Sequence, residues 1–144
     1  MATAKTATGT LRKALTAKLR ALGYPVSASV NSWPRIQLED VTEAEPIDKG
    51  HDVRELGFIV EVVSLGNYSE ADTAMTAIEE GLIGTDTITM TGFACLEIYK
   101  ELGQEIVAVG DADKLEITRR TQFRANIATK AGSGSGSGNG NTNN

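Results

Sequence analysis

The sequence predicts an α/β protein of the α+β kind: a mixed, largely antiparallel β-sheet with two main helices packed on it, in a single two-layer domain. The run from Glu55 to Ser64 is rich in β-branched and aromatic residues and is apolar at both alternating sets of positions, which is typical of a central strand. A Gly-Asn turn and an amphipathic stretch ending at Leu82 follow directly. Several shorter segments with a two-residue period supply the remaining strands.

The length of the chain fits one domain, and its composition excludes several classes of protein. The chain has 144 residues, and we expect a core domain over 10–130, a flexible arm over 1–9 and a flexible Gly/Ser/Asn-rich tail over 131–144. The net charge of −5 argues against non-specific binding of nucleic acid, and a single cysteine excludes an internal disulfide. We expect no membrane span and no secretory signal, because no apolar run is long enough.

The N-terminal third predicts one helix and two short strands. Thr10 is the expected cap of a helix that ends at Gly23. Strands are expected over 26–30 and 35–39, with a Trp-Pro turn between them. Trp33 is interpreted as a residue at the edge of the core, and an interface anchor is the alternative.

The segment 39–54 is acidic, lacks periodicity and is expected to form a long loop that contacts another subunit or solvent. Two chemical alternatives remain open for it. Glu43 and Glu45 would suit acid/base catalysis if they faced each other across a cleft. His51 with Asp48 and a second aspartate beside it would suit a metal ion, although one histidine with scattered acids matches no ligand spacing. We therefore favour contact over chemistry here.

The middle of the chain predicts which side chains meet in the core. Phe58, Val60 and Val62 share one face of the central strand, while the other face is mixed. Ser69 is the expected cap of the following helix, because its hydroxyl can accept a hydrogen bond from an amide one turn later. That helix directs an apolar stripe back onto the strand.

The C-terminal half predicts further strands over 86–91, 93–101 and 104–110, with a turn at Gly103. A helix over 93–101 is the alternative, because Ala, Leu, Glu and Lys also favour one. Cys95 is interpreted as a small buried residue in preference to a nucleophile, since no histidine lies near it in sequence.

The last predicted strand, 114–127, alternates most clearly. One of its faces is apolar, and the other is polar and basic with Arg120 and Arg124. Arg119 interrupts the apolar face, which predicts either a bulge or a contact between subunits at that position.

Four sequence pieces carry a resemblance to a known family. They are Leu11-Arg-Lys-Ala-Leu, Pro34-Arg-Ile-Gln-Leu, Phe58-Ile-Val-Glu-Val-Val ahead of Ser69-Glu-Ala-Asp, and Arg119-Arg-Thr-Gln-Phe-Arg-Ala-Asn-Ile. Together with the order of elements over 10–128, they resemble the tail terminator, or tail-completion, proteins of long-tailed bacteriophages.

The resemblance implies a structural virion protein that is not an enzyme and uses no cofactor or metal. Proteins of this family form a six-membered ring on the head-proximal end of the tail tube, where the ring stops tube growth and presents a surface for joining the head. The implied partners are further copies of the chain, the tail tube protein and a head-completion or connector protein. DNA would pass through the ring, without sequence-specific binding. The implied location is the tail or neck of the virion, after synthesis in the cytoplasm of a bacterial host.

Three other functions remain open at this point. The chain could be another neck component, such as a head-closure or adaptor protein, or it could be a tail tube protein. A different class is a small α/β enzyme that uses Cys95, His51 or the acidic segment.

A ring also needs two different contact surfaces, and the sequence offers two of opposite charge. We expect the basic face of the last strand to meet the acidic segment across or near a subunit boundary, with two solvated surfaces as the alternative. Reversing the charge of Arg120 and Arg124 should then weaken ring formation. The interface residues of this hypothesis are Arg119, Arg120, Arg124, Glu43, Glu45, Asp48 and Trp33.

Overall fold

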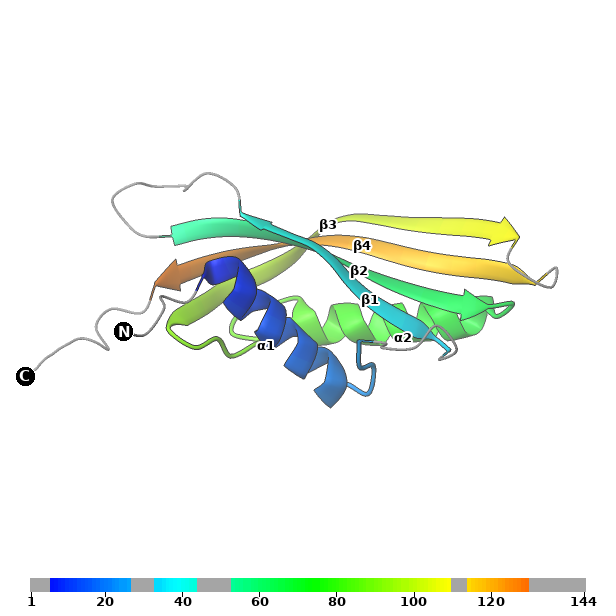
Figure 1. Cartoon of the computed structure of the whole chain (residues 1–144), viewed down its shortest axis with the longest axis horizontal. Coiled ribbons are helices and arrows are strands. Elements are labelled where there is room, and N and C mark those ends of the chain that lie inside the picture. Colours follow the sequence, from blue (N-terminus) through cyan, green and yellow to red (C-terminus); the bar gives the residue numbers. More distant parts are fainter. Residues whose placement is uncertain (1–5, 27–32, 44–52, 110–113, 130–144) are drawn as a thin grey trace, which may run out of the picture.

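Two helices and four strands make up the described part of the chain, which in this computed structural model covers residues 6–26, 33–43, 53–109 and 114–129. Both helices lie on the same side of one sheet (Figure 1). The predicted α+β class and its two layers are confirmed. The elements in chain order are α1 (Ala7–Ala21), β1 (Arg35–Glu43), β2 (Val53–Leu65), α2 (Tyr68–Leu82), β3 (Phe93–Val109) and β4 (Leu115–Thr129).

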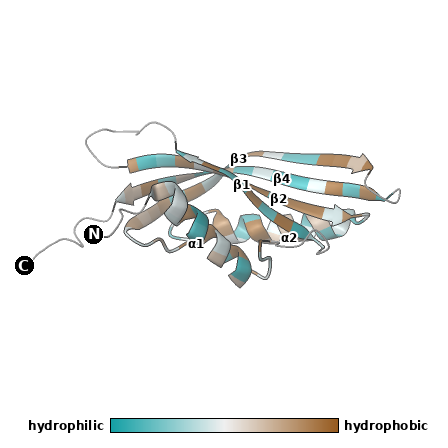
Figure 2. Ribbon diagram, in the orientation of Figure 1, coloured by the Kyte–Doolittle hydropathy of each residue, from teal (hydrophilic) through white to brown (hydrophobic). Residues whose placement is uncertain are grey.

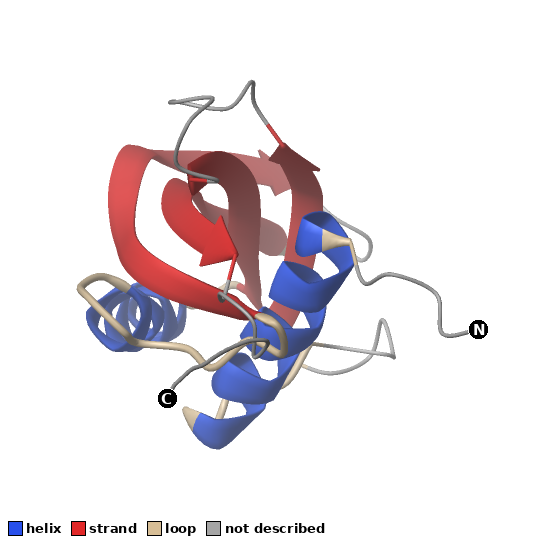
Figure 3. Ribbon diagram, turned by 90° about the vertical axis from the view of Figure 1, so that its left-hand side faces the viewer, coloured by secondary structure: helices blue, strands red, loops and turns tan. Residues whose placement is uncertain are grey.

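The sheet has the order β1-β2-β4-β3, and each neighbouring pair is antiparallel. β2 therefore lies inside the sheet, as its two apolar faces predict, and β1 and β3 form the edges. Seen end-on, the sheet is strongly twisted and curved, with the helices against one side of it (Figure 3). Neither helix in the described residues is long and apolar enough to cross a bilayer.

The core lies between the helices and one face of the sheet. Phe58, Val60 and Val62 are buried on that face, as predicted. The ring of Phe58 stacks on that of Phe123 of β4, with 5.0 Å between the ring centroids. Figure 2 shows the alternation of apolar and polar residues along the strands that produces this arrangement. The helices complete the core with Leu11, Leu15, Leu19, Ala74, Met75, Ile78 and Leu82.

Both helices begin at caps other than those predicted. Thr6 caps α1, where its hydroxyl oxygen accepts a hydrogen bond from the Gly9 amide at 3.1 Å. Asn67 caps α2, where its side-chain oxygen accepts from the Glu70 amide at 3.0 Å. The predicted caps at 10 and 69 lie inside the helices. Several residues of the capping type precede each apolar stripe, so the sequence offers more than one start.

The connection between β1 and β2 is shorter than the acidic loop that the sequence predicts. β1 extends to Glu43 and β2 begins at Val53, so both ends of the expected loop over 39–54 belong to strands. The register of β1 shifts between Glu39 and Thr42, and Asp40 has a φ of 54°. This bulge interrupts the alternation that would have revealed the strand. The middle of the segment, 44–52, and most of the strand expected over 26–30 lie outside the described residues.

β3 is one strand of 17 residues, where two strands and a turn at Gly103 were predicted. The register against β4 shifts between Cys95 and Glu97 and again between Lys100 and Leu102. Each bulge adds a residue and inverts the phase of the alternation, which breaks one long pattern into pieces. The helix alternative for 93–101 is wrong, and the described segment 86–91 forms no strand.

Candidate assembly surfaces

Arg120 and Arg124 lie on the sheet face opposite the helices, as the alternation of β4 predicts. Arg120 pairs with Glu61 of β2 and lies 3.9 Å from a carboxylate oxygen of Glu39 of β1. Arg124 donates to Glu101 of β3 at 3.1 Å. Both arginines therefore have carboxylate partners within the chain, drawn from β1, β2 and β3. Their contact with an acidic segment of another subunit remains a prediction.

The two acids beside Arg120 influence each other. Glu61 raises the pKa of Glu39 above its ordinary value, first through the hydrogen bond between the two carboxyls and then, after burial, through charge repulsion. Arg120 opposes this increase. A second cluster on the same face joins Arg124 at 3.5 Å to Glu55, which also accepts a hydrogen bond from the Tyr99 hydroxyl at 2.5 Å. This face is thus a polar surface with more carboxylates than arginines.

Arg119 lies on the other face of the sheet, beside α2. It pairs with Asp72 of α2 and lies 3.9 Å from a carboxylate oxygen of Glu105. The bulge predicted at this position is wrong, because β4 pairs with β2 without a register shift. Asp72 of α2 thus provides the ion-pair partner for Arg119, which explains why β4 carries a charged residue on its otherwise apolar face. Next to it, the hydroxyl of Thr121 donates to Glu79 at 2.8 Å. The sheet therefore separates Arg119 from the other two arginines.

The remaining predicted interface residues lie apart from these clusters. Trp33 has 37% of its surface exposed and is not part of the core, so its interpretation as a core-edge residue is wrong. The Arg35 guanidinium lies 5.1 Å from the centre of the Trp33 ring. Glu43 pairs with Arg54 at 3.3 Å, near the end of β1. Glu45 and Asp48, together with His51, lie outside the described residues.

Cys95 is buried on the helix-covered side of β3, as predicted. Burial, with a smaller contribution from Asp86, raises the pKa of the thiol to about 11. The thiol is therefore protonated at neutral pH and is a poor nucleophile. In the described segments no three His, Cys, Asp or Glu side chains lie close enough to hold a metal ion. Among the described residues, Cys95 is thus neither an activated thiol nor part of a metal-binding cluster.

The distal part of β3, with the β4 residues paired to it, is a surface that the sequence analysis missed. We call 102–109 and 115–122 the β3–β4 arm, since Leu102 pairs with Gln122 and Val109 with Leu115. All of 101–109 is exposed, and 71% of the surface of Val109 is accessible. Figure 1 shows this end of β3 lying away from both helices, and Figure 2 shows that it is apolar. The exposed apolar residues of the arm are Leu102, Ile106, Val107, Val109 and Leu115.

The arm exposes apolar side chains on both of its faces. Ile106 pairs with Thr118 and lies on the open face, whereas Val107 pairs with Ile117 on the helix side. The continuous apolar run from Ile106 to Val109 was the available signal, because such runs are typical of strands buried on both sides. Within the described chain no element covers either face of this run. β3 also forms an edge of the sheet, so one side of its backbone has no strand partner there.

Neither a known protein family nor a curated protein matches this chain. The fold is similar to that of a solved chain described as part of the virion of a native gene transfer agent particle. The TM-score is 0.68 and the sequence identity 19%, and the match covers 86% of this chain and 98% of that chain. At this identity the likeness establishes a shared fold, one that a virion component also adopts.

Proposed function

We propose that this chain is a structural protein of a phage-like virion and that it acts by assembling with other subunits. The observation that carries the proposal is the β3–β4 arm, which exposes apolar side chains on both faces. Large exposed apolar surfaces mark interaction sites in soluble proteins, because their burial against a partner contributes about 25 cal/mol per Å². The likeness to a chain of a gene transfer agent virion supports the proposal.

Within that class, we propose a tail terminator. Such a protein would close a ring, in the tail or neck of the particle, on the head-proximal end of the tail tube and present a surface for a head-completion protein. The sequence pieces of the resemblance support this role. The sheet supports it too, because its two edges, β1 and β3, differ in sequence and length. Two different edges suit head-to-tail contacts, which close into rings when the rotation fits.

The enzyme alternative finds little support in the described residues. Cys95 is buried with a raised pKa, and the acids beside Arg120 and Arg124 are engaged in ion pairs on an open sheet face. A buried, protonated thiol and neutralised carboxylates are poor starting points for catalysis. Another neck component or a tube protein would use the same surfaces, and assembly itself distinguishes these.

The test is the mass and shape of the purified full chain. We expect light scattering after size exclusion to give a multiple of the 15.2 kDa monomer, near six copies, and negative-stain images to show single closed rings. A chain that remains monomeric at tens of micromolar, by both measurements, would contradict the proposal. Tubes that grow with time would instead identify a tube protein, and rings that bind a portal but no tube end would identify an adaptor.

A further inference from the structure

The two helices carry opposite charge. α1 holds four basic residues and no acid, and α2 holds four acids and no basic residue. In a chain with 14 basic and 19 acidic residues, such a complete separation between two helices is not required by composition. The helices also pack on different parts of the sheet, α1 against β1 and α2 against β2, β4 and β3. The helical layer is therefore positive towards one sheet edge and negative towards the other.

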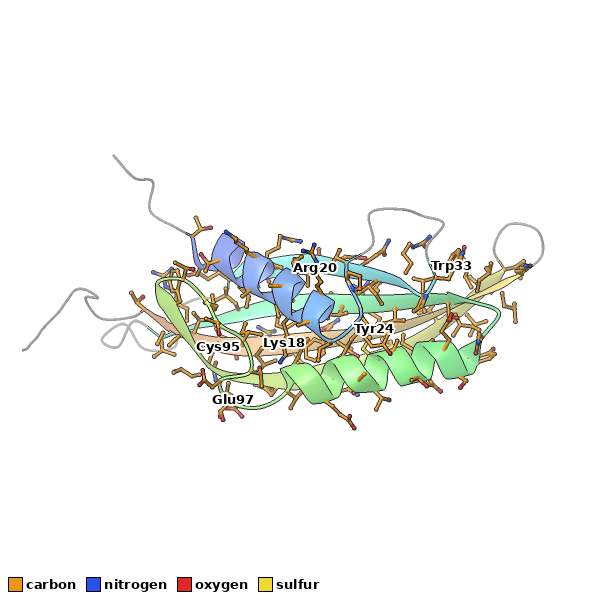
Figure 4. All side chains as sticks on the ribbon, turned by 90° about the horizontal axis from the view of Figure 1, so that it is seen from below. Lys18, Arg20, Tyr24, Trp33, Cys95 and Glu97 are labelled. Atoms are coloured by element: carbon orange, nitrogen blue, oxygen red, sulfur yellow. The ribbon has the colours of Figure 1, made fainter. Side chains whose placement is uncertain are left out.

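The outward cations of α1 are available for a partner. Lys13 and Arg20 are exposed, and neither has an ion-pair partner among the described residues. Between them on the helix surface lies Ala17, a small exposed residue. Lys18 differs, because it is only partly exposed and lines a shallow pocket together with the segment 87–89. Figure 4 shows Lys18 and Arg20 on opposite sides of α1. The outward face of α1 thus presents two basic side chains without ion-pair partners, Lys13 and Arg20, with the small apolar Ala17 between them.

α2 presents the complementary surface. Its outward stripe runs through Asp72, Thr76 and Glu80 to Ile83, all of them exposed. Glu80 has no ion-pair partner in the described part of the chain, and Asp72, although paired with Arg119, keeps 54% of its side chain accessible. Ile83, which caps the helix, exposes 39% of its surface. The stripe therefore combines free negative charge with one large apolar side chain.

We propose that the outward face of α1 in one copy docks on the outward face of α2 in the next copy. Lys13 and Arg20 would then meet Asp72 and Glu80, while Ala17 would face Thr76 between them. Like charges disfavour the pairing of either helix with its own copy. In a head-to-tail arrangement, each copy keeps one helix face free for a further copy, as a ring requires. The inference rests on the proposed function, since it assigns one of the contacts between neighbouring copies in the ring.

The test reverses the charge of each face separately. Lys13→Glu with Arg20→Glu makes the outward face of α1 acidic, and Thr76→Lys with Glu80→Lys makes the outward face of α2 predominantly basic. Each double variant should raise the dissociation constant of the ring about tenfold or more, because attraction becomes repulsion. Two combinations of these variants should then restore ring formation. The quadruple variant should form rings alone, and a 1:1 mixture of the two double variants should form rings in which they alternate.

The matched control is Lys18→Glu, which changes the charge of the same helix on its covered side and should leave the rings intact. Helicity from circular dichroism verifies that each variant folds, and Lys13→Gln with Arg20→Gln replaces the reversed pair if it does not. Rings that tolerate both double variants would overturn the inference, and so would variants that lose the rings with no recovery in the quadruple chain. The wild-type chain tests the proposed function separately, because without wild-type rings the function itself fails.

Discussion

At the scale of single residues, burial and near neighbours decide which side chains can react. Cys95 is the only thiol, and the structure places it among apolar side chains with a pKa raised to about 11. The sequence predicted its burial from its position in a strand. Its distance from any base could not be predicted, because such distances depend on how the strands pair.

We predict that Cys95 in the folded chain reacts with a disulfide reagent such as dithionitrobenzoate at least about 100-fold more slowly, near pH 8, than in the unfolded chain. The thiolate is the reacting species, and a raised pKa leaves little of it at that pH. The release of thionitrobenzoate measures the rate. Guanidinium-unfolded protein is the control, and equal rates in the two states would contradict the assignment of a buried thiol.

The pair of carboxyls on the open face makes stability depend on pH. Because Glu61 raises the pKa of Glu39 in the folded chain, folded protein binds this proton more tightly than unfolded protein does. The contribution of Glu39 to stability is therefore fully present below its ordinary pKa of 4.5 and is lost as pH rises through the raised value.

We predict that Glu39→Gln removes part of the decline in stability of the wild-type chain between about pH 4 and about pH 6.5. Urea unfolding at the two pH values measures this change. Glu97→Gln, at an exposed acid without a described ion-pair partner, is the control and should follow the wild type. A Glu39 carboxyl that titrates below 4.5 by NMR would show that Arg120 dominates over Glu61.

At the scale of elements, regular patterns were predictable and interruptions were not. The central β2 and the amphipathic α2 follow from periodicity, and both exist with nearly the predicted bounds. The bulges at Asp40 and near Leu102 each shift the alternation by one residue, so β1 was predicted too short and β3 was divided. The faces of Arg120 and Arg124 were predictable from β4, whose pairing is regular. Their partners were not, because those depend on strand order.

The contact between the helices depends on one glycine. A Cβ atom on Gly81 of α2 would lie 2.6 Å from a methyl carbon of Leu22, the residue that caps α1. Real side chains do not approach so closely, so the absence of a side chain lets the two helix ends meet. The sequence alone marks Gly81 only as a weak helix former.

We predict that Gly81→Ala lowers the free energy of unfolding by about 1–3 kcal/mol, although alanine by itself favours a helix by about 1 kcal/mol. Combining it with Leu22→Ala should reduce this cost, because the smaller side chain leaves room for the new methyl group. Urea unfolding of the single and double variants gives the coupling energy. A Gly81→Ala chain more stable than the wild type would show that Leu22 moves aside freely.

At the scale of the whole molecule, the chain contains more apolar surface than its own fold covers. The apolar stripes predicted for the helices and for the central strand are buried in the core between helices and sheet. The run from Ile106 to Val109 is an exception to this match between pattern and burial. Its continuous apolar residues predict a strand buried on both faces, but no described element covers either face. The apolar pattern of the sequence predicts that this run is covered, but it does not tell what covers it.

We predict that Val107→Ser with Val109→Ser changes the unfolding free energy of the chain by no more than about 0.5 kcal/mol, because both side chains are exposed. The same variant should weaken assembly, which light scattering measures. Leu96→Ser is the control, since it alters an equally exposed apolar residue of β3 outside the arm. Assembly unaffected by the arm variant would assign the exposed run a different partner.

The long open edge of β3 has a consequence for the chain before it meets any partner. An unpaired strand with apolar side chains is a template for irregular stacking, and edge charges such as Lys100 and Glu105 guard against it only in part. On the proposed function, we therefore expect the free subunit to be less soluble than the assembled form, in which a partner covers this edge.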